Sequence, residues 1–411
     1  MAIVKTPLQL LRRLSEYIME HKYYECNYIP NSIEEDSCLE CFVLVPNHFA
    51  ALHGDIELLK HIAAKIKSKC PKNSFGETPL HFAAFEGQLE ICKWYIKNTD
   101  EVNTADNSKW TALHFAASGG QVEIFKYLLA NGADLCLTDF QGQTSLHLAI
   151  KYLKICKLIV EVYKSIDINT KDNDGKTSIH SAIKYGELET VKFLFNTGGD
   201  LNSRTNKGDT TLHTAARYDH PEIVKFILAN VVDRSPMNEN RDTPLHIAAK
   251  KGFLETCKLI FPYVWDMDPK NNSGETPMFN AVEKGKLETV KYLFKIGGDL
   301  NSRTNHGDTP LHTATKHDLT EVVKFILANV VDRNPQNANG VTPLHIAASK
   351  GSLEIYRLIC QHVKDPLPLD LRAGIKVWTI DDTRNYFNFM HNPTNRGLTI
   401  QIRGKIFYHN S

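Results

Sequence analysis

Apolar and polar positions follow a pattern along the chain that repeats every 33 residues. Its clearest copy runs from Thr243 to Ala249, where Leu245, Ala248 and Ala249 have the i, i+3, i+4 spacing of one helix face. The threonine hydroxyl can accept a hydrogen bond from a free amide of the first helical turn, and proline suits the first helical position because no donor is needed there. The motif therefore predicts the start of a short amphipathic helix, whose paired alanines let a neighbouring backbone approach closely.

The motif occurs in phase along most of the chain. Its threonines lie 33 residues apart, at Thr78, Thr111, Thr144, Thr177, Thr210, Thr243, Thr276, Thr309 and Thr342. One further step back from Thr78 reaches a degenerate copy at residues 45–51, which makes ten units. A strict period of this length predicts a stacked array, in which each unit is one supersecondary element that buries its apolar face against its neighbours.

A turn and a second helix follow the motif in most units. A glycine such as Gly87, Gly186 or Gly252 supplies the left-handed turn that ends the first helix. An apolar segment such as residues 254–261 then predicts a second helix, and the polar stretch 200–209 predicts a turn-rich connector to the next unit. Each unit is thus expected to consist of two helices and a loop.

Two units depart from the pattern. The unit at Thr144 lacks the glycine turn, so we expect its helix hairpin to be distorted. The unit at Thr276 has Phe279 where the other motifs carry histidine, which removes a polar tie. In addition, residues 191–254 match residues 290–353 at an offset of 99, which indicates that a block of three repeats was duplicated.

The period divides the chain into three parts. Residues 1–44 predict an N-terminal helical cap, residues 45–363 the array of about ten repeats, and residues 364–411 a C-terminal tail. Within the tail, alternation at residues 375–380 and 397–408 predicts two short strands and hence a small β-hairpin. The rest of the fold is predicted to be all-α.

Composition limits the partner and the compartment. The 411 residues carry a net charge of +1, so no global field attracts nucleic acid or an anionic membrane. No apolar run is long enough to span a membrane, and we expect a monomer without membrane insertion. The nine cysteines are an odd number spread over many repeats, which argues against a disulfide framework. They predict a reducing compartment, the cytoplasm, with the nucleus as an open alternative.

The sequence offers little catalytic or metal-binding chemistry. The motif histidines, such as His81 and His246, occur once per repeat, whereas metal ligands must converge on one point. We therefore interpret them as hydrogen-bonding groups within and between the repeat loops. Cys38 and Cys41 form a lone pair without a second pair at zinc-finger spacing. No phosphate loop, nucleophile elbow or zinc-protease motif occurs, so we predict no enzyme activity, no cofactor and no metal site.

The Thr-Pro-Leu-His-x-Ala-Ala motif, the glycine turn and the 33-residue period together resemble the ankyrin-repeat family over residues 45–363. The resemblance implies an all-α solenoid of antiparallel helix pairs, with hairpin loops projecting at one edge and first helices lining a concave groove. It implies protein binding without catalysis, as a scaffold or adaptor. The alternatives are the recognition half of a ubiquitin-ligase adaptor, a pathogen effector or toxin, and a fragment of a larger ankyrin-repeat protein.

The resemblance also indicates where a partner binds. In this family the ligand-facing positions are connector residues just before the motif threonine and the residues seven and eight positions after it. The candidates at such positions are Phe75, Phe85, Trp110, Phe140, Lys151, Tyr152, Lys184, Tyr185, Arg217, Tyr218, Lys250, Lys251, Lys284, Lys316 and His317. Aromatic residues precede cations along the chain, so we expect an acidic partner segment with apolar or aromatic anchors. The alternative is a solvated rim with scattered aromatic residues.

Two connector asparagines are candidates for modification. Asn202 and Asn301 each follow Asp-Leu in a connector that begins with leucine. This arrangement is similar to the asparagine that cytosolic asparaginyl hydroxylases accept in ankyrin repeats. The simpler interpretation is an asparagine that only forms a turn.

Overall fold

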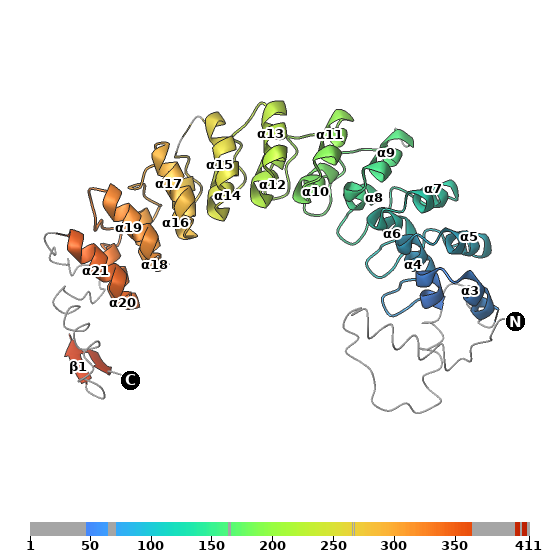
Figure 1. Ribbon diagram of the computed structural model, residues 1–411, viewed down its shortest axis with the longest axis horizontal. Helices are drawn as coiled ribbons and strands as arrows, with labels where there is room; N and C mark the ends of the chain where they lie inside the picture. Colours follow the sequence, from blue (N-terminus) through green and yellow to red (C-terminus); the bar gives the residue numbers. More distant parts are fainter. Residues whose placement is uncertain are drawn as a thin grey trace. The chain divides into compact units, whose positions relative to one another are not determined.

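The computed structural model describes residues 47–64, 71–162, 166–264, 266 and 268–363, together with strand residues 399–402 and 405–408 (Figure 1). Its backbone contacts divide the chain into two compact units within the repeat of Thr177. The first holds Met1–Ala182 and Lys192–Gly198, and the second holds Ile183–Val191 and Gly199–Ser411. Each unit is built from the successive helix pairs that the 33-residue period predicts.

Each motif threonine opens the first helix of a repeat. In the clearest copy, the Thr243 hydroxyl accepts a hydrogen bond from the His246 N–H, and Pro244 occupies the first helical position. The first helices are residues 47–53, α4 Pro79–Glu86, α6 Ala112–Gly119, α8 Ser145–Leu148 with η1 Ala149–Lys151, α10 Ser178–Lys184, α12 Thr211–Tyr218, α14 Pro244–Lys251, α16 Pro277–Glu283, α18 Pro310–Lys316 and α20 Pro343–Lys350.

The second helices follow a short turn. They are α3 Ile56–Ala63, α5 Leu89–Asn98, α7 Val122–Ala130, α9 Leu153–Val162, α11 Leu188–Asn196, α13 Pro221–Asn230, α15 Leu254–Ile260 with η2 Phe261–Tyr263, α17 Leu287–Lys295, α19 Thr320–Asn329 and α21 Leu353–His362. Among the described residues, no helix is both long and apolar enough to cross a membrane.

The turn between the two helices is left-handed, as predicted. Gly87 and Gly252 have φ angles of +89° and +83°, a conformation that glycine adopts without steric cost. A Cβ atom at Gly252 would also lie 2.6 Å from Lys286 Cδ, so this glycine makes room for a lysine of the next repeat. Two repeats use aspartate instead, with φ angles of +56° at Asp219 and +59° at Asp318. The sequence rule that sought a glycine did not anticipate these substitutions.

Between neighbouring repeats, first helices pack on first helices and second helices pack on second helices. In the second unit, α14 packs on α12 and α16, while α15 packs on α13 and α17; in the first unit, α6 packs on α4 and α8. Small residues permit this approach. Ala248 and Ala249 are fully buried, and a Cβ atom added to Gly119 of α6 would lie 2.4 Å from the Phe85 carbonyl oxygen of α4. Within each unit the core is therefore a seam of small and aliphatic side chains.

The two irregular units are irregular in the structure as well. In the Thr144 repeat, α8 has only four residues before the chain tightens into a 3₁₀ turn, so the predicted distortion is confirmed. In the Thr276 repeat, Phe279 is buried, and the reciprocal bond from a histidine ring to the threonine backbone is missing. The predicted loss of a polar tie is therefore also confirmed.

These two repeats are expected to open first. Because the stability of a repeat array is close to a sum of repeat and interface terms, a repeat is a weak point when its first helix is shortened, as in α8, or lacks the histidine bond, as in α16. Native-state hydrogen exchange should show faster exchange in α8 and α16 than in α14, which keeps the full set of capping bonds. Equal protection of the three helices would contradict this prediction.

The C-terminal tail contains a β-hairpin within the second of the two segments predicted to be strands. Strands β1 Thr399–Ile402 and β2 Lys405–Tyr408 pair antiparallel, with Thr399 opposite Tyr408. Both strands lie within the segment 397–408, which was predicted to be a single strand, so the prediction is corrected for this segment. The first predicted strand, at residues 375–380, lies outside the described residues, as does the predicted helical cap at residues 1–44.

Candidate partner-binding surface

Buried histidines position the hairpin connectors on which part of the surface lies. In the second unit, His246 Nδ1 accepts the Thr243 N–H at 3.0 Å, which leaves the proton on Nε2. Nε2 donates to the Glu275 carbonyl oxygen of the following connector, 3.1 Å away. His213 makes the same kind of bond to the Asp242 carbonyl oxygen at 2.9 Å. The predicted structural role of these histidines, within and between repeat loops, is confirmed.

Burial keeps these rings neutral. It lowers the pKa of His81 from its ordinary 6.5 to about 4, although the bond to the Thr104 carbonyl opposes the shift. Burial also lowers the pKa of His114, His147, His213 and His246. A neutral ring is required because Nδ1 must remain an acceptor for the threonine N–H.

Most of the predicted aromatic positions are exposed. Their exposed fractions range from 37% to 68%, for Phe75, Phe85, Phe140, Tyr152, Tyr185 and Tyr218. Two of the rings carry a cation: the Lys109 ammonium group lies 5.5 Å from the centre of the Phe140 ring, and that of Lys184 lies 5.2 Å from the centre of the Tyr185 ring. Each unit thus presents aromatic rings beside lysines.

Trp110 differs from the other aromatic candidates. It is half-buried, its indole Nε1 donates to Asp139 Oδ2 at 3.1 Å, and its ring meets Phe115 edge-on at 5.2 Å. The 33-residue period shows that Trp110 lies next to the motif. It does not show that Asp139, in the following connector, accepts the indole hydrogen bond. Truncation of this side chain would therefore disturb the packing between repeats.

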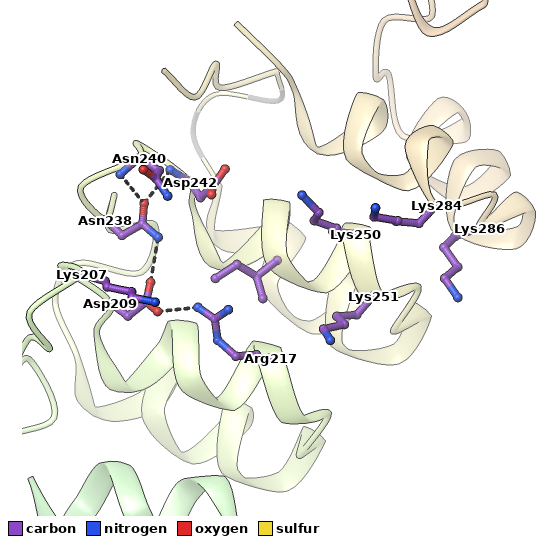
Figure 2. A pocket seen from close by; sticks show the side chains of 11 residues that line it. Lys207, Asp209, Arg217, Asn238, Asn240, Asp242, Lys250, Lys251, Lys284 and Lys286 are labelled. Carbon is purple, nitrogen blue, oxygen red and sulfur yellow. Dashed lines mark hydrogen bonds and ion pairs between the residues drawn. The ribbon is translucent and has the colours of Figure 1, made fainter. Parts of the chain in front are cut away.

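The second unit contains a hollow of about 580 Å³ beside α14 and α16 (Figure 2). Lysines from the ends of these helices lie on one side, and the hairpin asparagines and aspartates lie on the other (Figure 2). The lining residues are Lys207, Asp209, Arg217, Asn238, Asn240, Asp242, Ile247, Lys250, Lys251, Lys284 and Lys286. Four of the predicted partner-binding residues meet here: Arg217, Lys250, Lys251 and Lys284. We call this site the lysine hollow.

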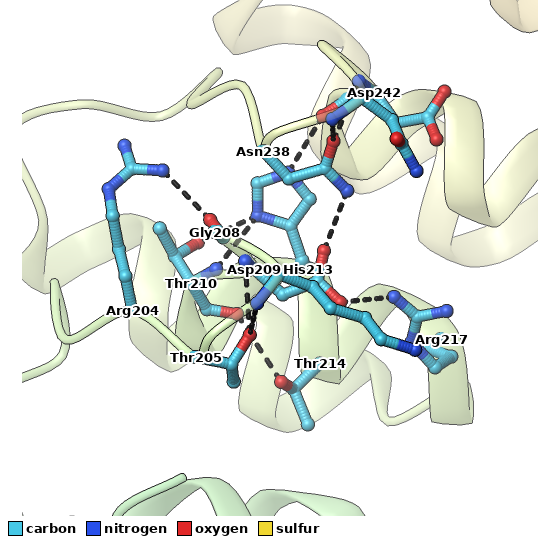
Figure 3. A network of polar contacts seen from close by, with 12 residues as sticks. Arg204, Thr205, Gly208, Asp209, Thr210, His213, Thr214, Arg217, Asn238 and Asp242 are labelled. Atoms are coloured by element: carbon cyan, nitrogen blue, oxygen red, sulfur yellow. Dashed lines mark hydrogen bonds and ion pairs between the residues drawn. The ribbon is translucent and has the colours of Figure 1, made fainter. Parts of the chain in front are cut away.

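Two carboxylates, those of Glu283 and Asp209, neutralise part of the positive charge around the lysine hollow. Glu283 lies 3.5 Å from the Lys250 Nζ atom and 2.9 Å from that of Lys284. Burial alone would raise the pKa of the Glu283 carboxyl group, but the two ammonium groups together lower it below its usual value. Asp209 is buried and pairs with Arg217, while its Oδ1 atom accepts from Asn238 Nδ2 at 2.7 Å (Figure 3).

Hydrogen bonds around Asp209 also fix the conformation of the connector at residues 200–209. Thr205 Oγ1 accepts from the Asp209 N–H at 3.2 Å, and Arg204 Nη1 donates to the Gly208 carbonyl oxygen at 2.8 Å (Figure 3). Arg204 Nη1 also donates to the Met237 carbonyl oxygen at 2.8 Å. Arg217 is therefore held by a buried aspartate rather than lying free on the surface. It contributes charge to the hollow in a fixed orientation.

A family model for ankyrin repeats, three copies long, matches residues 47–139, 88–172, 146–235, 212–304 and 295–370. The chain belongs to the ankyrin-repeat family. No curated protein matches it significantly. Ankyrin repeats are protein-interaction modules, so the match supports a protein partner without naming one.

The ankyrin-repeat period located some residues of the lysine hollow and missed others. Lys286 caps the second helix α17 and lies outside the predicted positions, whereas Asn238 and Asn240 lie in the connector before Thr243, where Asn240 is equivalent to Phe75 but was not among the predicted residues. A signal for Lys286 was available, because the glycine before it ends the first helix and directs the next residue toward the preceding repeat. Lys316 and His317, in contrast, are exposed and do not line the hollow.

The candidate hydroxylation sites lie on the same kind of ankyrin connector. Asn202 and Asn301 are exposed, and each backbone N–H donates to an aspartate two residues earlier, at 2.7 Å. This is an Asx turn in both cases, which agrees with the turn-forming interpretation. Their modification stays a prediction.

Proposed function

We propose that this ankyrin array is a protein-binding scaffold or adaptor that holds its partner along the ends of the first helices and the adjoining hairpins. The observation that carries the proposal is the exposure of six aromatic side chains at positions that the repeat period makes equivalent or neighbouring. A core residue would be buried, whereas an amphipathic ring beside a lysine is suited to hold a partner chain. Truncation of such a residue typically costs about 2 kcal/mol of binding energy.

The chemistry of the two units suggests the chemistry of the partner. The first unit presents Phe75, Phe85, Phe140 and Tyr152, and the second unit presents the lysines of the hollow together with Tyr185 and Tyr218. An acidic segment with apolar or aromatic anchors would complement both. Free thiols are buried at Cys92 and Cys257, where burial raises the pKa to about 12 and keeps them unreactive, which fits a reducing compartment such as the cytoplasm.

The experiment is affinity capture from the cells in which the chain occurs. We expect the triple variant Phe140→Ala, Tyr185→Ala, Tyr218→Ala to lose at least nine-tenths of the captured partner, because three exposed anchors are removed. These side chains are exposed and make no capping bond, so thermal melting should change little. Trp110 and Arg217 are left intact because they bond to Asp139 and Asp209.

The matched control removes exposed apolar surface elsewhere. Val232 and Val331 are 98% and 99% exposed in the loops that follow second helices, and Val232→Ala, Val331→Ala should capture the partner normally. If the triple variant captures its partner normally while deletion of residues 364–411 abolishes capture, the tail is the docking segment and the proposal is wrong.

A further inference from the structure

We propose that the lysine hollow binds an extended acidic stretch of the partner, with its carboxylates toward the lysines and its backbone N–H groups toward the hairpin. The inference rests on the proposed function and specifies one site within it. All of the residues that form the site belong to the second unit.

The helical side has positive charge to spare. Lys250 and Lys284 share the single carboxylate of Glu283. Lys251 and Lys286 are exposed and form no ion pair with any residue that the structure describes. The four ammonium groups on this side therefore share one carboxylate, that of Glu283. The positive charge is concentrated here, because the net charge of the whole chain is only +1. Such a local concentration of charge attracts anionic side chains and speeds association.

The hairpin side carries acceptors beside the single ammonium group of Lys207. Asp242 Oδ1 accepts from Asn271 Nδ2 at 2.9 Å, whereas within the described part of the chain Asp242 Oδ2 accepts no hydrogen bond. The buried Asp209 is already committed to Arg217 and Asn238, so it neutralises one cation and leaves Asp242 as the available carboxylate on this side. An acceptor on this side requires a donor from the occupant.

A peptide satisfies both sides, and a phosphate chain does not. Every second N–H group of an extended peptide points to the same side, so a strand lying across the hollow can donate to Asp242 while acidic side chains reach the lysines. Ile247 also lines the hollow and can contact an aliphatic stem. A nucleic acid or polyphosphate has negative charge on its whole backbone, and Asp242 and Glu283 would repel it.

The duplicated block provides an internal comparison. At the offset of 99 residues, Val341 replaces Asp242 and Ser349 replaces Lys250. Its lysines Lys316 and Lys350 are exposed, but the Lys350 ammonium group donates to the Lys316 carbonyl. The second copy therefore lacks both the free acceptor and one of the cations. It provides lysines on the same unit whose removal changes net charge equally but leaves the lysine hollow intact.

The test begins with a phage-displayed library of random dodecapeptides, selected on the full chain. Selected peptides are synthesised with a fluorescein label, and their Kd is measured by anisotropy on three variants. We expect acidic peptides, whose affinity falls about tenfold in the double variant Lys251→Gln, Lys286→Gln, because two exposed ion pairs are lost. Affinity should also fall in Asp242→Asn, which keeps an acceptor for Asn271 but removes the acceptor for the peptide. The control Lys316→Gln, Lys350→Gln should bind the peptides with unchanged affinity.

The other outcomes each decide the question. Peptides that are neutral, or that bind the lysine double variant normally, would overturn this site while leaving the proposed function intact. A library that yields no binder would count against the proposed function itself and against the site with it. A labelled dT12 oligonucleotide that binds more tightly to Asp242→Asn than to the unmodified chain would show a phosphate-chain site and overturn the peptide. Melting temperatures within about 2 °C of the unmodified chain would show that the exposed substitutions leave the array folded.

Discussion

Acidification from pH 7 to pH 4.5 is expected to destabilise the repeat array by several kcal/mol and to unfold its weakest repeats. Burial lowers the pKa of His81 from 6.5 to about 4 and lowers that of the motif histidines His114, His147, His213, His246, His312 and His345. In this range the unfolded chain binds protons at histidine and the folded chain does not. The free energy of unfolding therefore falls as pH falls below about 6.5.

His81 gives the scale of the effect. Its pKa change from 6.5 to about 4 corresponds to about 3 kcal/mol, present in full above pH 6.5 and lost as pH approaches 4. Small domains have only about 5 to 15 kcal/mol in total. Asp268, whose pKa burial raises, acts in the opposite direction, but it is one group against several.

Urea unfolding, followed by circular dichroism at pH 7, 6, 5.5 and 5, would measure this dependence before most carboxylates protonate. A His81→Phe variant places at this position the residue that the Thr276 repeat already holds, and it should show a shallower pH dependence than the unmodified chain. A free energy of unfolding that is constant from pH 7 to pH 5 would show that the histidines are not buried neutral groups.

The repeat period was sufficient to predict the frame because each motif residue acts locally. The threonine cap, the proline and the left-handed glycine depend on neighbours within a few residues, so their effect can be inferred from sequence alone. Asp219 shows the limit. It adopts the left-handed turn without being glycine, and Thr256, 37 residues further on, donates to its carboxylate at 2.8 Å. A contact of that range was not visible in the motif.

The candidate surface was predictable in position but not in its pairings. A fixed offset from the threonine correctly indicated that Tyr185 and Tyr218 would be exposed. It could not show that Asp209 would form an ion pair with Arg217. Nor could it show that the Lys286 side chain would lie against Gly252 and line the hollow. The Asp209–Arg217 pair spans eight residues and depends on the side chains that this one repeat carries, whereas the approach of Lys286 to Gly252 joins two repeats and follows from their stacking. Outside the array no period constrains the chain, and the strand predicted at residues 375–380 stays a prediction.

Replacing His246 with alanine is expected to lower the stability of the second unit by about 3 to 5 kcal/mol, because the loss combines two buried polar groups with a cavity. The Thr243 N–H would lose its acceptor and the Glu275 carbonyl its donor, at 3.0 and 3.1 Å in the intact chain. Each unpaired buried group costs about 1 to 3 kcal/mol. Differential scanning calorimetry would record the change as a lower melting temperature and a broader transition.

Two substitutions separate the contributions. His246→Phe fills the cavity as Phe279 does in the next repeat, but it removes both bonds. It should therefore destabilise the second unit, by less than His246→Ala does. His345→Ala removes a ring that bonds to Thr342 and, among the described residues, finds no partner in a following connector. Its cost should be the smallest of the three, because only the bond within its own repeat is lost.

The order of these three costs distinguishes two descriptions of the array. If the bond between the His246 ring and the Glu275 carbonyl carries the coupling between repeats, both His246 variants should also reduce the cooperativity of unfolding, since the connector at residues 266–275 loses its anchor to the preceding repeat. His345→Ala should leave cooperativity unchanged. Equal costs for His246→Ala and His345→Ala, with unchanged cooperativity in both, would instead mean that the seam of buried alanines alone couples the repeats and that the histidine serves only to cap its own helix.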